Sequence, residues 1–86
     1  MHNIFTERAW TEYLMWQNED KKTLKKINSL LLDINRNGIK SRIGKAELLK
    51  SRRGYSKRID EKNRLVYDFD SKGNVIILSC KGHYCE

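Results

Sequence analysis

A polar turn between two strand-like runs, within residues 54–69, constrains the fold of this chain more than any other stretch. Residues Asp60–Asn63 have turn chemistry, because aspartate and asparagine side chains bond to nearby backbone groups. Side chains alternate between the faces of a strand, so Leu65, Tyr67 and Phe69 predict an apolar core face on the second strand. The core face expected for the first strand carries Tyr55, Lys57 and Ile59. The stretch therefore predicts an antiparallel hairpin packed by one face against a core.

The opposite face of this hairpin carries Arg58 on the first strand and Arg64 on the second. Two guanidinium groups held on a sheet suit a phosphate, because each is a planar and permanently charged fork of donors. The alternative is that both arginines are solvated or paired with Asp60 and Asp68. On the hairpin alone, this alternative is the stronger interpretation.

The length and charge of the chain limit its function. Its 86 residues, 1–86, form one domain, and a chain this short buries a small core. Catalytic groups would therefore have to lie on the surface of a sheet. Charged residues make up 34% of the chain and the net charge is +7, which favours a polyanionic partner such as nucleic acid, an acidic protein or an anionic membrane.

The sequence predicts a soluble, cytoplasmic protein without a membrane partner. No apolar run approaches the roughly 18 residues of a membrane span, and the first residues lack the pattern of a signal peptide. Cys80 and Cys85 are expected to be free thiols in that reducing compartment. A metal site of Cys80, His83 and Cys85 would lack a fourth ligand and a recognised spacing, so no metal or cofactor is expected.

A short strand at residues 3–5 is expected to lead into a first helix. Thr6 can cap this helix by accepting a hydrogen bond from a free backbone N–H of the first turn. The side chains expected in the core from this helix are Trp10, Tyr13 and Trp16. Those expected to face outward are Glu7, Arg8 and Glu12.

The second helix shows the stronger pattern, with Asp20 as its cap and Gly38 just beyond its end. Its apolar stripe recurs at steps of three and four residues through Leu24, Ile27, Leu30, Leu31 and Ile34. Its opposite face carries Lys21, Lys22, Lys25 and Lys26. These lysines are expected either to be solvated or to contact phosphates.

The rest of the chain completes a sheet. Residues 39–53 hold no long apolar period and are expected to form a loop, with one turn of helix near Glu47. Residues 71–74 predict a turn, and the apolar run 75–78 predicts a strand buried on both faces or nearly so. The fold class predicted is α+β: a short N-terminal strand, two antiparallel helices, then an antiparallel sheet of three or more strands.

The residue types permit metal-free cleavage of RNA. A base takes the proton of the ribose 2′-OH as it attacks phosphorus, cations stabilise the phosphorane, and an acid protonates the 5′-oxygen. Glu47 could be the base, Arg58 and Arg64 the cations, and His83 the acid. Most proteins of this size contain such residues, so the types alone leave the function open.

Several blocks of the sequence resemble the YoeB/Txe toxins of the RelE superfamily, in order and at similar spacing. The first resembles their first helix and runs from Trp10 through Tyr13 and Leu14 to Trp16 and Gln17. The others are Asp20–Asn28, Ile43–Lys50, Lys57–Tyr67 and Cys80–Tyr84, which ends in His-Tyr. The resemblance spans nearly the whole chain and implies a RelE-like microbial RNase fold.

The resemblance implies an activity and a set of residues. Toxins of this family enter the ribosomal A site and cut the mRNA there. By motif, Glu47 would be the general base, Arg64 the transition-state stabiliser and His83 the acid, with Tyr84 as an orienting or stacking aromatic and Arg58 as a further active-site arginine. Contacts to RNA are expected from Lys45, Lys50, Arg52, Arg53 and Lys57.

The resemblance also implies partners. These are the ribosome with its mRNA, and a cognate antitoxin of the YefM/Axe type whose acidic C-terminal segment suits the +7 charge. Operator DNA would be bound only through the toxin–antitoxin complex, and a homodimer is a further assembly to test. Two other functions stay open: a catalytically silent toxin fold that binds antitoxin and operator DNA, and a free-standing RNA-binding module.

Overall fold

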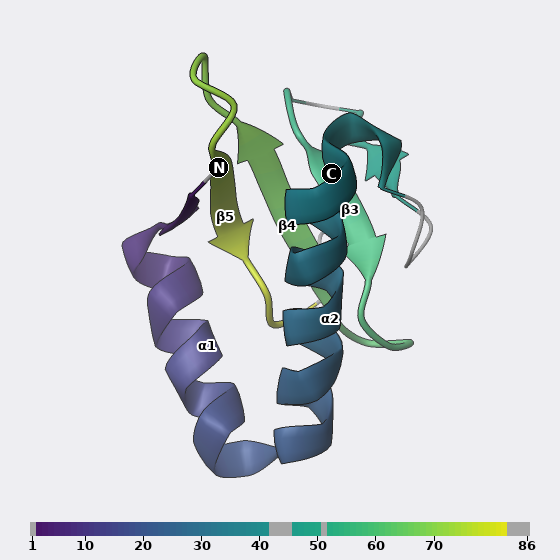
Figure 1. Ribbon diagram of the computed structural model, residues 1–86. Coiled ribbons are helices and arrows are strands. Elements are labelled where there is room, and N and C mark those ends of the chain that lie inside the picture. Colours follow the sequence, from purple (N-terminus) through teal and green to yellow (C-terminus); the bar gives the residue numbers. More distant parts are fainter. Residues whose placement is uncertain (1, 42–45, 51, 83–86) are drawn as a thin grey trace.

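The computed structural model describes residues 2–41, 46–50 and 52–82, which form two layers. In chain order the elements are β1 (Asn3–Phe5), α1 (Glu7–Glu19), α2 (Lys21–Asn37), a 3₁₀ turn η1 (Gly38–Lys40), β2 (Glu47–Leu48), β3 (Tyr55–Arg58), β4 (Arg64–Phe69) and β5 (Val75–Ser79). Both helices lie on the same face of the sheet, joined at one end like the arms of a V (Figure 1). Within the described ranges, neither helix combines the length and apolarity needed to cross a bilayer.

The sheet has five strands in the order β1-β5-β4-β3-β2. The β3–β4 hairpin predicted from the sequence is present, with its polar turn at residues 59–63. Strands β2, β3, β4 and β5 pair antiparallel, whereas β1 pairs parallel with β5. The predicted α+β class is confirmed, and the parallel edge strand is an addition to it. The chain can return to β5 in parallel only because both helices and the hairpin intervene.

The helix boundaries follow the predicted caps. Thr6 Oγ1 accepts from the backbone N–H of Ala9 at 3.1 Å, as expected for an N-cap. Asp20 ends α1 and begins α2, and its carboxylate accepts from the backbone N–H groups of Lys22 and Thr23. Gly38 follows α2 with φ of 56°, a conformation in which a side chain is strained.

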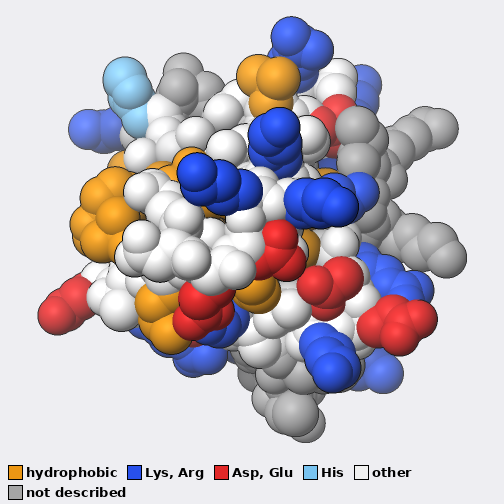
Figure 2. Space-filling model, turned by 90° about the horizontal axis from the view of Figure 1, so that it is seen from below, with side chains coloured by type: hydrophobic (Ala, Val, Ile, Leu, Met, Phe, Trp, Pro, Cys, Tyr) orange, Lys and Arg blue, Asp and Glu red, His pale blue; other side chains and the backbone are white. Residues whose placement is uncertain are grey.

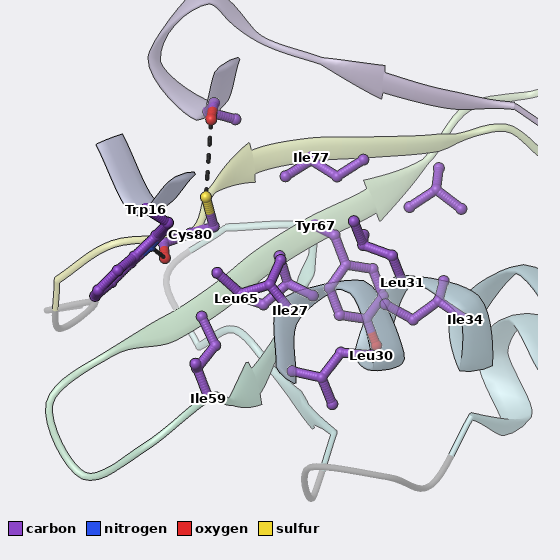
Figure 3. Close-up of a cluster of buried hydrophobic side chains, with 12 residues drawn as sticks. Trp16, Ile27, Leu30, Leu31, Ile34, Ile59, Leu65, Tyr67, Ile77 and Cys80 are labelled. Carbon is purple, nitrogen blue, oxygen red and sulfur yellow. Dashed lines mark hydrogen bonds between the residues drawn. The ribbon is translucent and has the colours of Figure 1, made fainter. Parts of the chain in front are cut away.

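The core lies between the helices and the sheet (Figure 3). The stripe predicted on α2 is confirmed, because Ile27, Leu30, Leu31 and Ile34 are buried. The predicted core face of the hairpin is confirmed by Leu65 and Tyr67 on β4, with Ile59 of the turn beside them. Strand β5 alternates, with Val75 and Ile77 buried and its other apolar side chains partly exposed, so it is covered mainly on the helix side.

The first helix agrees with the prediction at two of its three expected core side chains. Trp16 is buried, as expected, and its indole Nε1 donates to the carbonyl of Cys80 at 2.9 Å. Tyr13 is half-buried and packs against the core, also as expected, whereas Trp10 is 48% exposed and lines a surface hollow. Glu12 was expected to face outward, but its carboxylate accepts from the backbone N–H of Cys80 at 2.8 Å. Glu12 thus satisfies a backbone N–H just beyond the end of β5.

The stretch between α2 and β3 also differs from the prediction. It contains the 3₁₀ turn and the two-residue strand β2, which pairs with β3 where one helical turn was expected. Neither element has a periodic apolar pattern, because both are too short to show one. The pairing matters for function, since β2 carries Glu47.

Lys57 lies in a buried polar network between β3 and α2. Its side chain is 0% exposed, and its Nζ donates to the Asp33 carboxylate at 3.3 Å and to the Ser41 hydroxyl. Ser41 in turn donates to the Asp33 carboxylate, and Asn37 donates to its other oxygen at 2.8 Å. The expected RNA contact by Lys57 is therefore wrong. Burying a lysine ammonium is costly unless an opposite charge pairs with it, and here the Asp33 carboxylate does so.

We expect the buried network around Asp33 to make the free energy of unfolding depend on pH in the acidic range. The hydrogen bond from Ser41, with those from Asn37 and Lys57, lowers the pKa of Asp33 from 3.8 to about 2, although burial acts the other way. A carboxyl group with a depressed folded-state pKa contributes stability above about pH 4 and loses it as the pH falls toward 2. Urea unfolding should show the wild type and Asp33→Asn converging as the pH falls through this window. A difference that does not vary with pH would contradict this assignment.

We also expect the network to be asymmetric under substitution. Asp33→Ala should lower the free energy of unfolding by roughly 3 kcal/mol, because it removes the carboxylate that forms the salt bridge with the buried Lys57 ammonium. Adding Lys57→Met should recover much of this loss, since the buried charge is then gone. Urea unfolding at neutral pH measures both variants. A double variant that is less stable than Asp33→Ala would show that the lysine stabilises the fold without its partner.

Candidate active site

The face of the sheet away from the helices holds a cleft of about 180 Å³ lined by Glu47, Ser56, Arg58 and Arg64. Strand pairing explains the grouping. Arg58 is the direct partner of Arg64 across β3 and β4, and Glu47 is the direct partner of Ser56 across β2 and β3. Directly paired side chains lie on the same face of a sheet. Three strands therefore place one carboxylate and two guanidinium groups around one cleft.

The Arg64 guanidinium is oriented by backbone carbonyls. Its Nη1 donates to the carbonyl of Asp60 at 2.9 Å and to that of Asn63 at 3.4 Å. The Asp60 carboxylate does not bind the Arg64 guanidinium. It accepts hydrogen bonds from within the turn instead, including those from the backbone N–H groups of Lys62 and Asn63. Burial opposes ionisation of Asp60, but the hydrogen bonds from Asn63 and Lys62 still lower its pKa. Arg64 thus keeps donors for a ligand.

The alternative that acidic neighbours neutralise both arginines is not realised in the described structure. The Asp68 carboxylate pairs instead with Arg53, at 3.5 Å. Among residues 2–41, 46–50 and 52–82, Arg58 and Arg64 have no carboxylate within salt-bridge distance. The two guanidinium groups therefore remain a cationic pair beside Glu47, which is the arrangement a phosphate group would satisfy.

The described chain ends close to this cleft. The backbone N–H of Arg64 donates to the carbonyl of Gly82 at 3.0 Å, and the side chain of Asn63 accepts from the N–H of Gly82 at 2.8 Å. His83 and Tyr84, expected at the site, lie outside the described residues, as does Lys45. Gly82, which immediately precedes His83, is thus held at the Arg64 end of the cleft.

The remaining basic side chains expected to contact RNA lie on the loop between β2 and β3. Lys50, Arg52 and Arg53 are all exposed there, and Arg52 and Arg53 line a second hollow with Leu48. The positive charge is not confined to this loop. In the view of Figure 2, the Lys and Arg side chains of the described residues are interspersed with Asp and Glu side chains.

Two residues at the site were not anticipated. Ser56 lines the cleft between Glu47 and Arg58, and the alternation of β3 could have placed it there. Asn63 was expected only as part of a turn, and its bond to Gly82 joins residues 19 apart in the sequence. No local pattern reports such a contact.

Cys80 does not supply reactive chemistry to this site. Its thiol is free and fully buried beside α1, where burial, reinforced by Glu12, raises its pKa to about 12. A thiol is a metal ligand or nucleophile only when it ionises. In the described part of the chain, no three His, Cys, Asp or Glu side chains are grouped as metal ligands would be.

The chain has close relatives among known toxins. It matches, over residues 5–84, the family described as the YoeB-like toxin of bacterial type II toxin–antitoxin systems. It is 40% identical to Toxin YoeB of Escherichia coli strain K12, an alignment that covers 98% of this chain and 100% of the relative. It is 45% identical to Toxin YoeB of Synechocystis, covering 98% of both chains.

Solved structures agree over the same length. The YoeB dimer from Staphylococcus aureus superposes with a TM-score of 0.88 at 44% identity, covering 98% of both chains. A chain of the heterotetrameric YoeB–YefM toxin–antitoxin complex from S. aureus gives a TM-score of 0.87 at 45% identity, again over 98% of both chains. The YoeB/ParE toxin from Agrobacterium tumefaciens gives 0.90 at 31% identity, covering 98% of this chain and 100% of that one. These matches confirm the predicted RelE-like fold.

We expect the residues of the cleft to contribute little to stability. Glu47 and Arg58 are exposed and lie outside the hydrophobic core. Glu47→Ala and Arg58→Ala should therefore change the free energy of unfolding by less than about 0.5 kcal/mol each, as surface substitutions usually do. Urea unfolding followed by circular dichroism measures this, with Ile34→Ala as a core control that should cost roughly 2–5 kcal/mol. A large loss at Glu47 would identify it as a structural residue.

Proposed function

The chain belongs to the YoeB-like toxins of bacterial type II toxin–antitoxin systems, and on that premise we propose that it is a ribosome-dependent endoribonuclease that cuts mRNA in the ribosomal A site. The observation that carries the proposal is the cleft on the face of the sheet away from the helices (the open face), which is lined by one carboxylate and two arginines. The reaction is attack of a ribose 2′-oxygen on the adjacent phosphorus. It breaks the bond to the 5′-oxygen and leaves a 2′,3′-cyclic phosphate.

Glu47 is assigned as the general base. Its carboxylate is exposed in the cleft and can accept the 2′-OH proton as the oxygen–phosphorus bond forms. Arg64 and Arg58 lie directly across from each other on β4 and β3, where they can donate to the phosphate oxygens that gain charge in the transition state. Because both arginines lie on paired strands, the sheet holds their backbones in a fixed register.

His83 is assigned as the general acid and Tyr84 as the aromatic that orients it or stacks on a base. Support for His83 comes from Gly82, the residue before it, which is bonded to the backbone of Arg64. The proton that the 5′-oxygen needs on leaving would come from an imidazolium, since histidine titrates near neutral pH. Lys45, Lys50, Arg52 and Arg53 are proposed to contact the RNA backbone.

The small volume of the cleft favours an RNA substrate that a second macromolecule holds in place. At about 180 Å³ it is smaller than the roughly 300–1,000 Å³ of pockets that enclose a small ligand. The described lining residues therefore do not enclose a nucleotide by themselves. The ribosome would hold the mRNA in the reactive geometry, and the toxin would add acid, base and cations.

The proposed partners follow from charge and family. An antitoxin of the YefM type, with an acidic segment, would complement the net charge of +7 and cover the arginines of the cleft. The S. aureus relatives are described as a dimer and as a YoeB–YefM complex, and we propose both assemblies for this chain. Operator DNA would be bound through the complex, and the place of action is the cytoplasm.

Cleavage of a defined mRNA on purified, programmed ribosomes tests the proposal. Wild type should cut within the A-site codon and should cut feebly without ribosomes. Glu47→Gln and His83→Ala should each slow the cut by at least about 100-fold, the usual worth of an acid or base. Glu61→Gln, at an exposed acidic residue of the hairpin turn, should cut normally.

Three results would change the assignment. Normal cleavage by Glu47→Gln would move the base to another residue. Cleavage that is equally fast without ribosomes would remove the ribosome from the mechanism. A folded wild type that cuts nothing in either arm would leave the catalytically silent antitoxin-binding module as the better account.

A further inference from the structure

Asn63 uses both ends of its side-chain amide. Its Nδ2 donates to the two oxygens of the Asp60 carboxylate at 3.1 and 3.0 Å, and its Oδ1 accepts from the Gly82 backbone N–H at 2.8 Å. Asp60 is itself fixed by the backbone N–H groups of Lys62 and Asn63, at 2.8 and 2.7 Å. The amide is thus anchored in the turn at one end and holds Gly82 at the other.

The same turn holds Arg64. The Arg64 guanidinium donates to the carbonyl of Asp60 at 2.9 Å, while its backbone N–H donates to the carbonyl of Gly82 at 3.0 Å. Gly82 is therefore bound through both of its peptide groups, by the side chain of Asn63 and by the backbone of Arg64. Residues 60–64 fix the Arg64 side chain and Gly82 relative to each other.

The chain before Gly82 has little freedom to compensate. Glu12 accepts from the backbone N–H groups of Cys80 at 2.8 Å and Lys81 at 3.2 Å, and Trp16 donates to the carbonyl of Cys80 at 2.9 Å. Helix α1 thus fixes residues 80 and 81, and Asn63 supplies the last side-chain bond before His83 among the described residues.

We propose that Asn63 is a positioning residue for RNA cleavage: its amide fixes Gly82, the residue before His83, beside Arg64. The inference rests on the proposed function, in which His83 protonates the leaving oxygen. A displacement of about 1 Å in a catalytic group costs on the order of 100-fold in rate. Asn63 affects the rate through His83 and does not itself contact the RNA.

The competing explanation is that Asn63 only stabilises its turn, and the chain offers a matched control. Asn74 closes the β4–β5 turn in the same way, with its Nδ2 on the Asp70 carboxylate at 3.1 Å and its Oδ1 accepting from the backbone N–H of His2 at 3.1 Å. It ties the N-terminal strand to a turn as Asn63 ties Gly82. Removing either amide should weaken a turn, but only Asn63 is bonded beside the cleft.

Single-turnover cleavage on programmed ribosomes, over a range of toxin concentrations, separates the two explanations. Asn63→Ala should lower the rate at saturating toxin by about 10- to 100-fold and change the half-saturating concentration by less than about 3-fold, because ground-state binding is untouched. Asn74→Ala should cut within about 2-fold of wild type. Urea unfolding confirms that both variants are folded and similarly weakened.

A double variant tests whether Asn63 acts through His83. In the His83→Ala background, Asn63→Ala should cause almost no further loss, because the group it positions is already absent. Gly82→Ala gives an independent route if Asn63→Ala is too unstable to assay. Gly82 has φ of 93°, where a side chain strains the backbone, so this variant should show the same loss in saturated rate.

Two results would overturn the inference: a saturated rate for Asn63→Ala equal to that of Asn74→Ala, or an undiminished further loss in the His83→Ala background. Each differs from a failure of the proposed function. If the wild type does not cut, the proposed function is wrong. If the wild type cuts, His83→Ala is slow and Asn63→Ala is normal, only the positioning role is wrong.

Discussion

The pairing of β3 with β4 is the constraint on which the rest of the structure depends. Because side chains alternate along each strand, one register determines both faces of the hairpin at once. Toward the helices, Leu65 and Tyr67 close the hydrophobic core. Toward solvent, the same register sets Arg58 opposite Arg64. A slip of one residue would place the arginines in the core and remove the cleft.

Because the protein is small, contacts on the helix side of the sheet also fix the positions of side chains on the cleft side. Lys57 lies between Ser56 and Arg58, so the strand that presents cleft residues on one side is anchored to Asp33 of α2 on the other. The chain just beyond β5 is anchored in a similar way, since Glu12 and Trp16 bond to the backbone of residues 80 and 81. Buried polar contacts, in addition to the core, hold the positions of the groups that would meet the RNA.

Local patterns in the sequence predicted the elements that are local in origin. The caps Thr6 and Asp20 and the stripe on α2 each depend on residues a few positions apart, and all were confirmed. What the sequence could not reveal depends on distant partners. Glu12 points inward because its carboxylate accepts from a backbone N–H 68 residues away in the sequence. Lys57 is buried because its ammonium pairs with a carboxylate 24 residues away. The structure brings Glu47 and the two arginines into one cleft, a grouping that only the motif resemblance implied, because such a resemblance carries long-range information that periodicity lacks. The roles of these residues stay predictions.

The central claim is that the open-face cleft directs attack by a ribose 2′-oxygen. The most direct measurement is cleavage of a ribosome-bound mRNA in which a single nucleotide, 5′ to the cut phosphate, carries 2′-hydrogen in place of 2′-hydroxyl. The account predicts that this substitution abolishes cleavage at that phosphate, while the all-ribose mRNA yields a 2′,3′-cyclic phosphate end. Undiminished cutting of the 2′-deoxy mRNA at the same phosphate would contradict it, because the nucleophile would then have to be a group other than the ribose hydroxyl.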